Sequence, residues 1–139
     1  MAAAIGRLKQ RSEFLRVAGA RRKWAAPGLV LQGFERPDGA DAPGPPRVGF
    51  TATRKIGGAV QRNRARRRLR AAAAAVMPDH ASAGWDYVIV AREGTLTRPF
   101  AGLLDDLSQA LVRVSRGGQP GRPSPRAASP GGQKEGEGP

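Results

Sequence analysis

Arginine and lysine side chains crowd into one short stretch of this chain. Eight basic residues and no acidic residue lie between Arg54 and Arg70. Like charge at this density repels itself unless a polyanion neutralises it. The chemistry that this stretch can perform is the binding of phosphate groups, and its expected partner is a nucleic acid.

The composition of the whole chain agrees with that partner. The 139 residues carry a formal net charge of +13, and the sequence pI is about 11.7. A pI this far above 9 is typical of a nucleic-acid binder. The basic residues are mostly arginine, whose planar fork matches phosphate and stacks on bases, whereas diffuse attraction to lipid more often uses lysine. A membrane surface is therefore the poorer fit.

The other reactive side chains do not form a hydrolytic centre. Metal-dependent phosphodiester cleavage needs clustered carboxylates. Only Asp105 and Asp106 are adjacent, and adjacent helix positions do not share a face. His80 is the single histidine and is expected at the surface, and the absence of cysteine excludes disulfides and zinc fingers. We predict no catalytic residue and no metal site in the polypeptide.

The basic stretch is predicted to be a helix that follows a strand. Residues 47–54 alternate, with Val48, Phe50 and Ala52 on one face and Thr51 and Thr53 on the other. Gly57-Gly58 then reads as a turn. A helical period begins beyond the turn, and Pro78 is expected to stop the helix. The predicted buried stripe of this helix is Ala65, Leu69, Ala72 and Val76.

The arginines surround this narrow stripe. Arg62 and Arg66 flank it on one side and Arg68 on the other. The rest of the circumference carries Asn63, Arg64, Arg67 and Arg70. Asn63 is the lone neutral polar residue of the cluster, and its amide could both donate and accept hydrogen bonds. With about six phosphates neutralised, the log–log salt slope of binding should be roughly −4 to −5.

The remaining patterns predict an α+β domain with one small sheet and helices packed on it. A short helix is expected after an N-cap at Ser12, with Phe14 and Val17 on one face and its end at Gly19. Strands are expected at 28–35 and 85–92, and one more short strand between Gly19 and Pro46 is left open. A last helix should start near Pro99. Its expected apolar face is Phe100, Leu103, Leu107, Leu111 and Val114. Phe50 and Phe100 are expected to be core residues, and Trp85 is expected in the core or in edge packing.

The domain is expected to occupy residues 1–114. Residues 115–139 include seven glycines and five prolines and almost nothing apolar, so we predict a disordered tail. Residues 36–46 are predicted to form a surface loop. The N-terminus lacks a secretory signal, and no segment reaches the roughly 18–20 apolar residues that span a bilayer. The expected location is the cytoplasm.

Residues 47–70 resemble the signature of a known family, the protein subunit of bacterial ribonuclease P. The similar elements are a strand reading Arg-x-Gly, a basic pair, a Gly-x-Ala-Val turn, and Arg-Asn-Arg followed by more basic residues. Arg7-Leu8-Lys9 and Phe14 are similar to the N-terminal region of that family, and residues 86–92 to its late strand. The resemblance therefore extends over most of the predicted domain.

The resemblance implies a small two-layer sandwich with an about four-stranded mixed sheet. It also implies a left-handed βαβ crossover, contrary to the usual right-handed rule. The holoenzyme of the family is an endoribonuclease that removes the 5′ leader from precursor tRNA. Its RNA carries the catalysis and binds most of the Mg²⁺. The implied partners are the ribonuclease P catalytic RNA and precursor tRNA, with no membrane and no DNA.

Site residues are implied by the same resemblance. The implied RNA-binding residues are Lys55, Arg62, Asn63, Arg64, Arg66, Arg67 and Arg70. A cleft between the sheet and the first helix would hold the single-stranded leader, with Phe14, Phe50 and Thr51 as its residues. The family usually has a second aromatic residue where this chain has Ala18, and Trp24 or Phe34 could substitute for it.

Two other functions remain open on the sequence alone. Composition and charge fit equally well a structural RNA-binding protein of the ribosomal or RNA-chaperone type, without any enzymatic assembly. A helix-turn-helix DNA-binding regulator fits less well, since that fold does not need three strands and its recognition helix rarely carries so many arginines.

Overall fold

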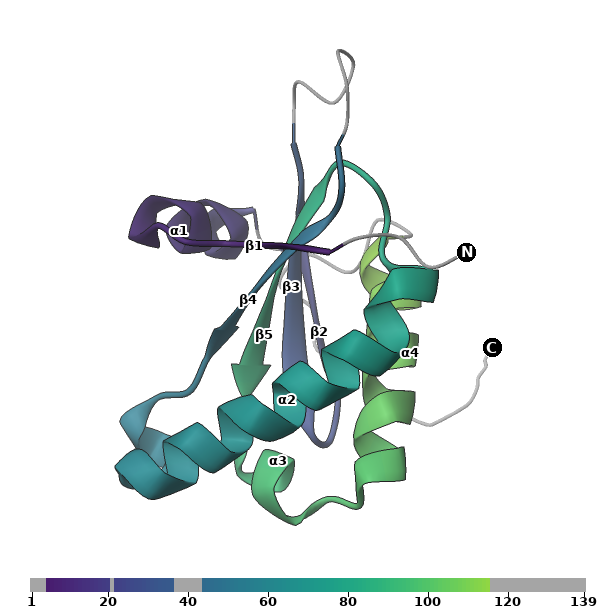
Figure 1. Cartoon of the computed structure of the whole chain (residues 1–139). Coiled ribbons are helices and arrows are strands. Elements are labelled where there is room, and N and C mark those ends of the chain that lie inside the picture. The colour runs from purple at the N-terminus through teal and green to yellow at the C-terminus, as the bar shows by residue number, and fades with distance from the viewer. Residues whose placement is uncertain (1–4, 21, 37–43, 116–139) are drawn as a thin grey trace.

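The computed structural model describes residues 5–20, 22–36 and 44–115 (Figure 1). Apart from Ser115, which ends the last helix, the predicted tail lies outside the described residues, as does most of the predicted loop at 36–46. In the described part of the chain, no helix is long and apolar enough to cross a bilayer.

Five strands form one mixed sheet in the order β1-β4-β5-β3-β2. Strands β1, β4 and β5 are parallel, whereas β3 runs antiparallel to both β5 and β2. The strand bounds are Gly6–Arg7 for β1, Arg22–Ala25 for β2, Leu29–Glu35 for β3, Arg47–Thr51 for β4 and Trp85–Ala91 for β5. The three long strands and the additional short strand β2 are confirmed. The two-residue β1 was not predicted, because two residues carry no readable alternation.

In the described ranges, four α-helices and one 3-10 helix accompany the sheet. Their bounds are Arg11–Gly19 for α1, Arg54–Ile56 for the 3-10 helix η1, Ala59–His80 for α2, Glu93–Thr97 for α3 and Phe100–Ser115 for α4. The five-residue α3 was not predicted. The helices predicted around Phe14, along the basic stretch and after Pro99 are confirmed, and the fold is α+β as expected.

Two predicted helix boundaries are wrong. Helix α1 begins one residue before Ser12, and Gln10 is its N-cap. The carboxylate of Glu13 accepts the backbone N–H groups of Lys9 and Gln10 at 2.8 and 3.0 Å, so Glu13 holds the chain just before the helix. Pro78 does not stop α2, which ends at His80. The helix continues for two residues beyond Pro78, and the N–H of Ala81 donates to the Met77 carbonyl at 2.8 Å.

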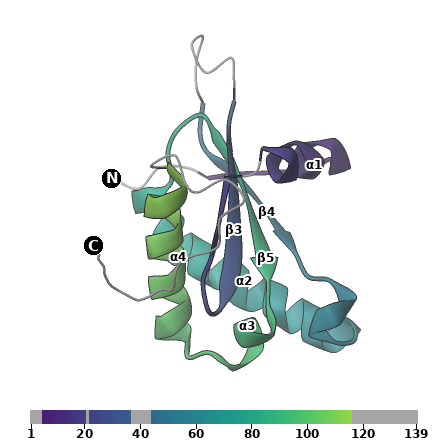
Figure 2. The same cartoon turned by 180° about the vertical axis from the view of Figure 1, so that it is seen from behind.

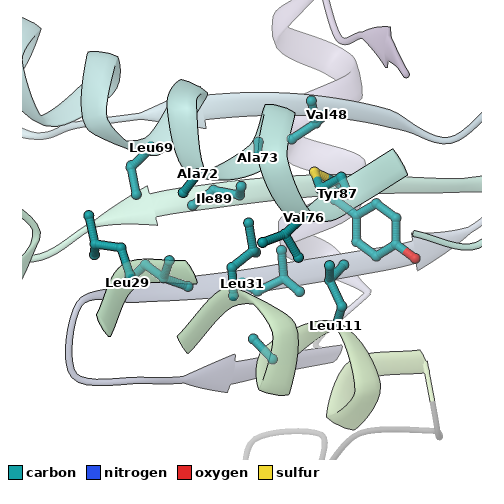
Figure 3. Close-up of a cluster of buried hydrophobic side chains, with 14 of the residues drawn as sticks. Leu29, Leu31, Val48, Leu69, Ala72, Ala73, Val76, Tyr87, Ile89 and Leu111 are labelled. Atoms are coloured by element: carbon teal, nitrogen blue, oxygen red, sulfur yellow. The ribbon is translucent and has the colours of Figure 1, made fainter. Parts of the chain in front are cut away.

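The helices lie on both faces of the sheet. Helices α2 and α4 cover one face, and α1 lies on the other (Figures 1 and 2). The main core fills the space between the sheet and α2 and α4. Figure 3 shows Leu29, Leu31 and Ile89 of the sheet converging on Leu69 and Leu111 of the two helices, all at 1% exposure or less.

The apolar faces predicted from periodicity mostly reach this core. All four stripe residues of α2 are buried, together with Ala73 and Met77. Trp85 is 6% exposed and is core as expected, and Phe50 is half-buried against the core. Phe100 is 42% exposed, so its assignment to the core is wrong. It is the first residue of α4, and the stripe of that helix is anchored only from Leu103 onwards.

The connection from β4 through α2 to β5 joins two adjacent parallel strands. In Figure 1 both strands run downward, α2 passes in front of the sheet, and β5 lies to the right of β4. This sense is left-handed, as the resemblance implied, and is opposite to nearly all βαβ units.

Candidate nucleic-acid interface

The basic residues are presented by the start of α2 and the turn before it. Gly57 has φ of +139°, a conformation that favours glycine, and it turns the chain from η1 into the helix. Arg62 donates from its guanidinium to the Gly57 carbonyl at 3.0 Å, which closes this turn onto the helix. No acidic residue lies in the first turn of α2. The N-terminal dipole of α2 therefore adds to the positive potential of its arginines.

The seven RNA-binding residues implied by the sequence lie together on this segment. The buried stripe turns them outward: Lys55, Asn63, Arg64, Arg67 and Arg70 are exposed, and Arg62 and Arg66 are half-buried. Figures 1 and 2 show the first half of α2 projecting beyond the end of β4, away from α4. The guanidinium groups of these arginines therefore face solvent, and they are carried by a helix whose buried stripe packs on the core.

No described carboxylate neutralises these cations. The five ion pairs among residues 5–20, 22–36 and 44–115 involve only Arg16, Arg36, Arg47 and Arg98 as cations. Within the cluster, Arg66 donates to the amide oxygen of Asn63 at 3.0 Å. That contact occupies the Asn63 acceptor and leaves its N–H donors. The positive charge of α2 is therefore available to an external polyanion.

Arg68 differs from the other arginines of α2. Its guanidinium donates to the backbone carbonyl of Arg98, and its Nε is buried without a hydrogen-bond partner. Arg98 in turn donates to Asp106 at 2.6 and 3.0 Å, and Asp106 also accepts the N–H of Gly28 at 2.9 Å. Arg68 thus fastens α2 to the segment before α4. Asp105 stays exposed while Asp106 is buried, so the two acids do not share a face, as expected.

The second face of the sheet carries a smaller apolar cluster beneath α1. Leu8, Val17 and Val88 are buried there, with Phe14, Phe34 and Val90 packed against them. The ring of Phe14 lies directly against β4: a Cβ built on Gly49 would be 2.4 Å from its Cζ. The glycine of the Arg-x-Gly pattern is therefore the residue that lets Phe14 approach the strand backbone.

The three residues proposed for the leader cleft lie on two different faces of the sheet. Thr51 pairs with Val90 and lies on the Phe14 face, where it is half-buried. Phe50 pairs with Ile89 and packs against the core on the opposite face, with Arg70 5.8 Å above its ring. Phe50 therefore cannot line a cleft beneath α1, and that assignment is wrong. The alternation within β4 already contained this signal, because it separates Phe50 from Thr51.

Trp24 and Phe34 were considered as substitutes for an aromatic residue at the Ala18 position. Of the two, only Phe34 lies on the face of the sheet that α1 covers. Phe34 belongs to the cluster beneath α1, and the guanidinium of Arg16 lies 5.2 Å from its ring centre. Trp24 packs against the main core on the α4 side of the sheet. Ala18 itself is exposed.

A buried ion network that the sequence did not reveal fixes α1 to the sheet. Asp86 in β5 is 0% exposed and accepts two hydrogen bonds from Arg47 at 2.8 Å each and one from Arg36 at 2.6 Å. Arg16 of α1 lies 3.5 Å from the same carboxylate, and Arg47 also donates to Glu13 of α1 at 3.0 Å. The network therefore joins α1 to β4 and β5.

Both acidic members of this network are stabilised in their charged form. Burial raises the pKa of Asp86, but the hydrogen bonds from Arg47 and Arg36 outweigh it and hold the pKa below its usual value. The pKa of Glu13 is lowered chiefly by the backbone N–H groups of Gln10 and Lys9. Both carboxylates are therefore charged at neutral pH.

Comparison with known proteins gives a consistent family. The family model described as Ribonuclease P matches residues 4–115. The ribonuclease P protein component of Paramagnetospirillum magneticum is 58% identical over 115 residues, covering 82% of this chain and 86% of the relative. The corresponding protein of Ruegeria pomeroyi is 50% identical over 111 residues, covering 79% and 86%.

Solved structures agree on the fold. The Staphylococcus aureus RNase P protein superposes with a TM-score of 0.62 at 21% identity, covering 78% of this chain and 95% of that one. The RNase P protein of Thermotoga maritima gives a TM-score of 0.62 at 22% identity, covering 79% and 96%. With half or more of the aligned residues identical to two proteins of that name, over 86% of the length of each, the chain belongs to the ribonuclease P protein component family.

Proposed function

We propose that this chain is the protein subunit of a ribonuclease P holoenzyme, which removes the 5′ leader of precursor tRNA. The observation that carries the proposal is the first half of α2, where exposed arginines lie without carboxylate partners among the described residues. In this proposal the α2 surface binds the catalytic RNA. The residues of that surface are Lys55, Arg62, Asn63, Arg64, Arg66, Arg67 and Arg70.

The RNA carries the catalysis in this proposal and binds the Mg²⁺ that the reaction requires. Nothing in the described residues offers three grouped His, Cys, Asp or Glu side chains for a metal ion. The carboxylates that are held in place have other partners: Glu13 and Asp86 bind Arg47, and Asp106 binds Arg98. The polypeptide contributes positive charge and positioning, and these support the binding of substrate and metal by the RNA.

The single-stranded leader is proposed to lie on the sheet face beside α1. Phe14 and Thr51 lie on this face, and Phe34 offers a further aromatic ring under Arg16. Aromatic and arginine planes of this kind stack on unpaired bases, at about 1–3 kcal/mol per base. Phe14 and Phe34 are both half-buried, so part of each ring remains accessible.

Reconstitution tests the function directly. The full chain is mixed with a bacterial ribonuclease P RNA at low Mg²⁺, and cleavage of precursor tRNA at the leader junction is followed. We expect the protein to raise the cleavage rate above that of the RNA alone. The double variant Arg64→Ala/Arg67→Ala tests the α2 surface in the same assay, since it removes two exposed charges and leaves the buried stripe intact.

The same assay separates the proposal from a purely structural RNA-binding role. Tight RNA binding without any gain in cleavage over the RNA alone would indicate the structural role and contradict the proposal. Equal enhancement by the wild-type chain and by the double variant would contradict the assignment of the α2 surface.

A further inference from the structure

Two tryptophans on the α4 side of the sheet are each covered by an arginine. The guanidinium carbon of Arg22 lies 5.1 Å from the ring centre of Trp85, and that of Arg113 lies 5.0 Å from the ring centre of Trp24. Trp85 stacks in turn on Tyr87, with centroids 5.9 Å apart and planes 16° from parallel. We call Arg22, Trp24, Trp85 and Arg113 the tryptophan–arginine surface.

The four residues come from three elements, β2, β5 and α4, that meet at one place. Arg22 and Trp24 are two residues apart in β2, so they share a face of the sheet. Arg22 pairs with Gly33 of β3, where a built Cβ would lie 2.5 Å from a Val114 methyl carbon and 3.1 Å from the Trp85 ring. The end of α4 therefore packs beside Arg22, and Arg113 directly precedes Val114.

Both arginines lack a carboxylate partner among the described residues. Neither takes part in any of the five ion pairs. Glu35 lies two residues beyond Gly33 on the same face of β3, yet it forms no ion pair with them. Arg113 is exposed and Arg22 is half-buried. The surface thus carries two positive charges that the described part of the chain does not neutralise.

Stacking suits these guanidinium groups to phosphate. A guanidinium that lies over an indole keeps its N–H donors in its own plane, where they can bind an anion bidentately. The stack also restricts a long side chain that would otherwise lose rotamer entropy on binding. Such pairs therefore favour phosphate more than free surface lysines do.

The tryptophan–arginine surface lies at the other end of the molecule from the basic start of α2. In Figure 1 the start of α2 is at the lower left and the end of α4 at the upper right, and Figure 2 shows the same separation from behind. A folded RNA larger than the domain can reach both ends at once. The two surfaces are therefore separate contacts.

We propose that the tryptophan–arginine surface is a second RNA-binding site, at which Arg22 and Arg113 bind backbone phosphates. The proposed occupant is the same catalytic RNA, so the inference rests on the proposed function. Phosphate contacts of this kind carry no base specificity; they fix the orientation of the protein on the RNA.

Salt dependence tests the site. Binding of the full chain to a ribonuclease P RNA is measured over a range of salt concentrations, without precursor tRNA. Arg22→Ala/Arg113→Ala should make the log–log slope shallower by about 1–2 units, since each phosphate contact contributes roughly 0.7–0.9. Lys23→Ala is the matched control: Lys23 is exposed on the opposite face of β2, and its loss should leave the slope unchanged.

A second pair of variants separates charge from packing. Arg22→Lys/Arg113→Lys keeps both charges but loses the planar stacks, so it should keep the slope and weaken binding at every salt concentration. An unchanged slope in the alanine pair overturns the site. If the alanine pair does not fold, Arg113→Glu is compared with Lys23→Glu, and equal losses of affinity overturn the site.

The outcomes also separate this site from the proposed function. If the wild-type chain enhances cleavage but the alanine pair has an unaltered salt slope, the second RNA-binding site is contradicted and the proposed function stands. If the alanine pair has a shallower salt slope but the wild-type chain does not enhance cleavage, the proposed function is contradicted and the surface remains an RNA-binding surface.

Discussion

The backbone of β4 approaches an aromatic ring most closely at Gly49. A Cβ there would lie 2.4 and 2.5 Å from two carbons of Phe14 and 3.3 Å from Leu8. Real carbon atoms do not approach so closely, and the ring belongs to a helix that a small apolar cluster and an ion network hold down. The absence of a side chain at Gly49 therefore sets the distance between α1 and the sheet.

We expect Gly49→Ala to lower the free energy of unfolding by about 1–3 kcal/mol, the usual range for overpacking. The measurement is chemical denaturation followed by tryptophan fluorescence. In a Phe14→Ala background the added methyl has room, so the same substitution should cost much less. Equal costs in the two backgrounds would show that Phe14 and Gly49 are not coupled.

Asp86 is a second residue whose substitution should strongly change the free energy of unfolding. Asp86→Asn removes the charge that Arg36 and Arg47 bind, and we expect a loss of about 3 kcal/mol, the lower end for a broken buried pair, because the arginines are partly exposed. Asp105→Asn is the control, since Asp105 is exposed and belongs to no ion pair among the described residues. Equal destabilisation by both variants would contradict the network.

The stabilisation by Asp86 should depend on pH in one direction. Its pKa in the folded chain is lowered by the arginines, so its contribution is fully present above the unfolded pKa of about 3.9. The contribution is lost as the pH falls through the lower folded value. The difference in unfolding free energy between wild type and Asp86→Asn should be level from about pH 5 to 7 and shrink below about pH 4. A difference that grows on acidification would refute the assignment.

At the scale of the element, α2 carries arginines of two kinds. Arg64 and Arg67 point to solvent and make no hydrogen bond or ion pair with another described residue, whereas Arg68 reaches back to the Arg98 carbonyl. The difference follows from position around the helix, because Arg68 is the arginine on the side of the stripe that faces α3 and α4. One helix therefore combines an exposed cationic surface with its own attachment to the domain.

We expect Arg64→Ala/Arg67→Ala to weaken binding to a ribonuclease P RNA and to reduce the log–log salt slope by about 1–2 units in filter binding. Thermal stability should stay close to that of wild type, since neither side chain packs on the core. Arg68→Ala should do the reverse, lowering stability with little change of slope. A slope that follows Arg68 and ignores Arg64 and Arg67 would overturn this division.

At the scale of the whole molecule, the charge is distributed unevenly over the two faces of the sheet. Beneath α1, three arginines share the carboxylates of Asp86 and Glu13, so much of their charge is neutralised internally. On the α2 and α4 side, Asp106 is the only carboxylate among the described residues that forms an ion pair, and it binds Arg98. Four of the five ion pairs of the described residues therefore lie beneath α1, and the arginines on the other face, apart from Arg98, have no carboxylate partner among those residues.

We expect a chain truncated after Ser115 to keep nearly full activity in the reconstituted holoenzyme. The removed residues are rich in glycine and proline and have almost no apolar side chains that could pack on the domain. Cleavage rate and RNA affinity of the truncated and full-length chains would be compared at equal salt. A large loss of either would show that the C-terminal residues contact RNA.

The sequence by itself determined the parts that depend on local periodicity. The four-residue stripe of α2 specified which side of that helix is buried, and hence which arginines are exposed. The alternation of β4 and the long apolar run of β5 specified two strands. A helix or strand pattern is set by residues a few positions apart, so it survives without knowledge of the rest of the fold.

Only the tertiary structure decided which elements those faces meet. The Asp86 network joins residues up to 70 positions apart, Arg16 and Asp86, and nothing in the local pattern pairs Asp86 with Arg36 or Arg47. The placement of Phe50 away from Phe14, and the anchoring of Arg68 to Arg98, likewise follow from packing between distant elements. Periodicity shows that a face is buried, but the partner of that face is chosen by the closure of long loops and the fit of side chains in three dimensions.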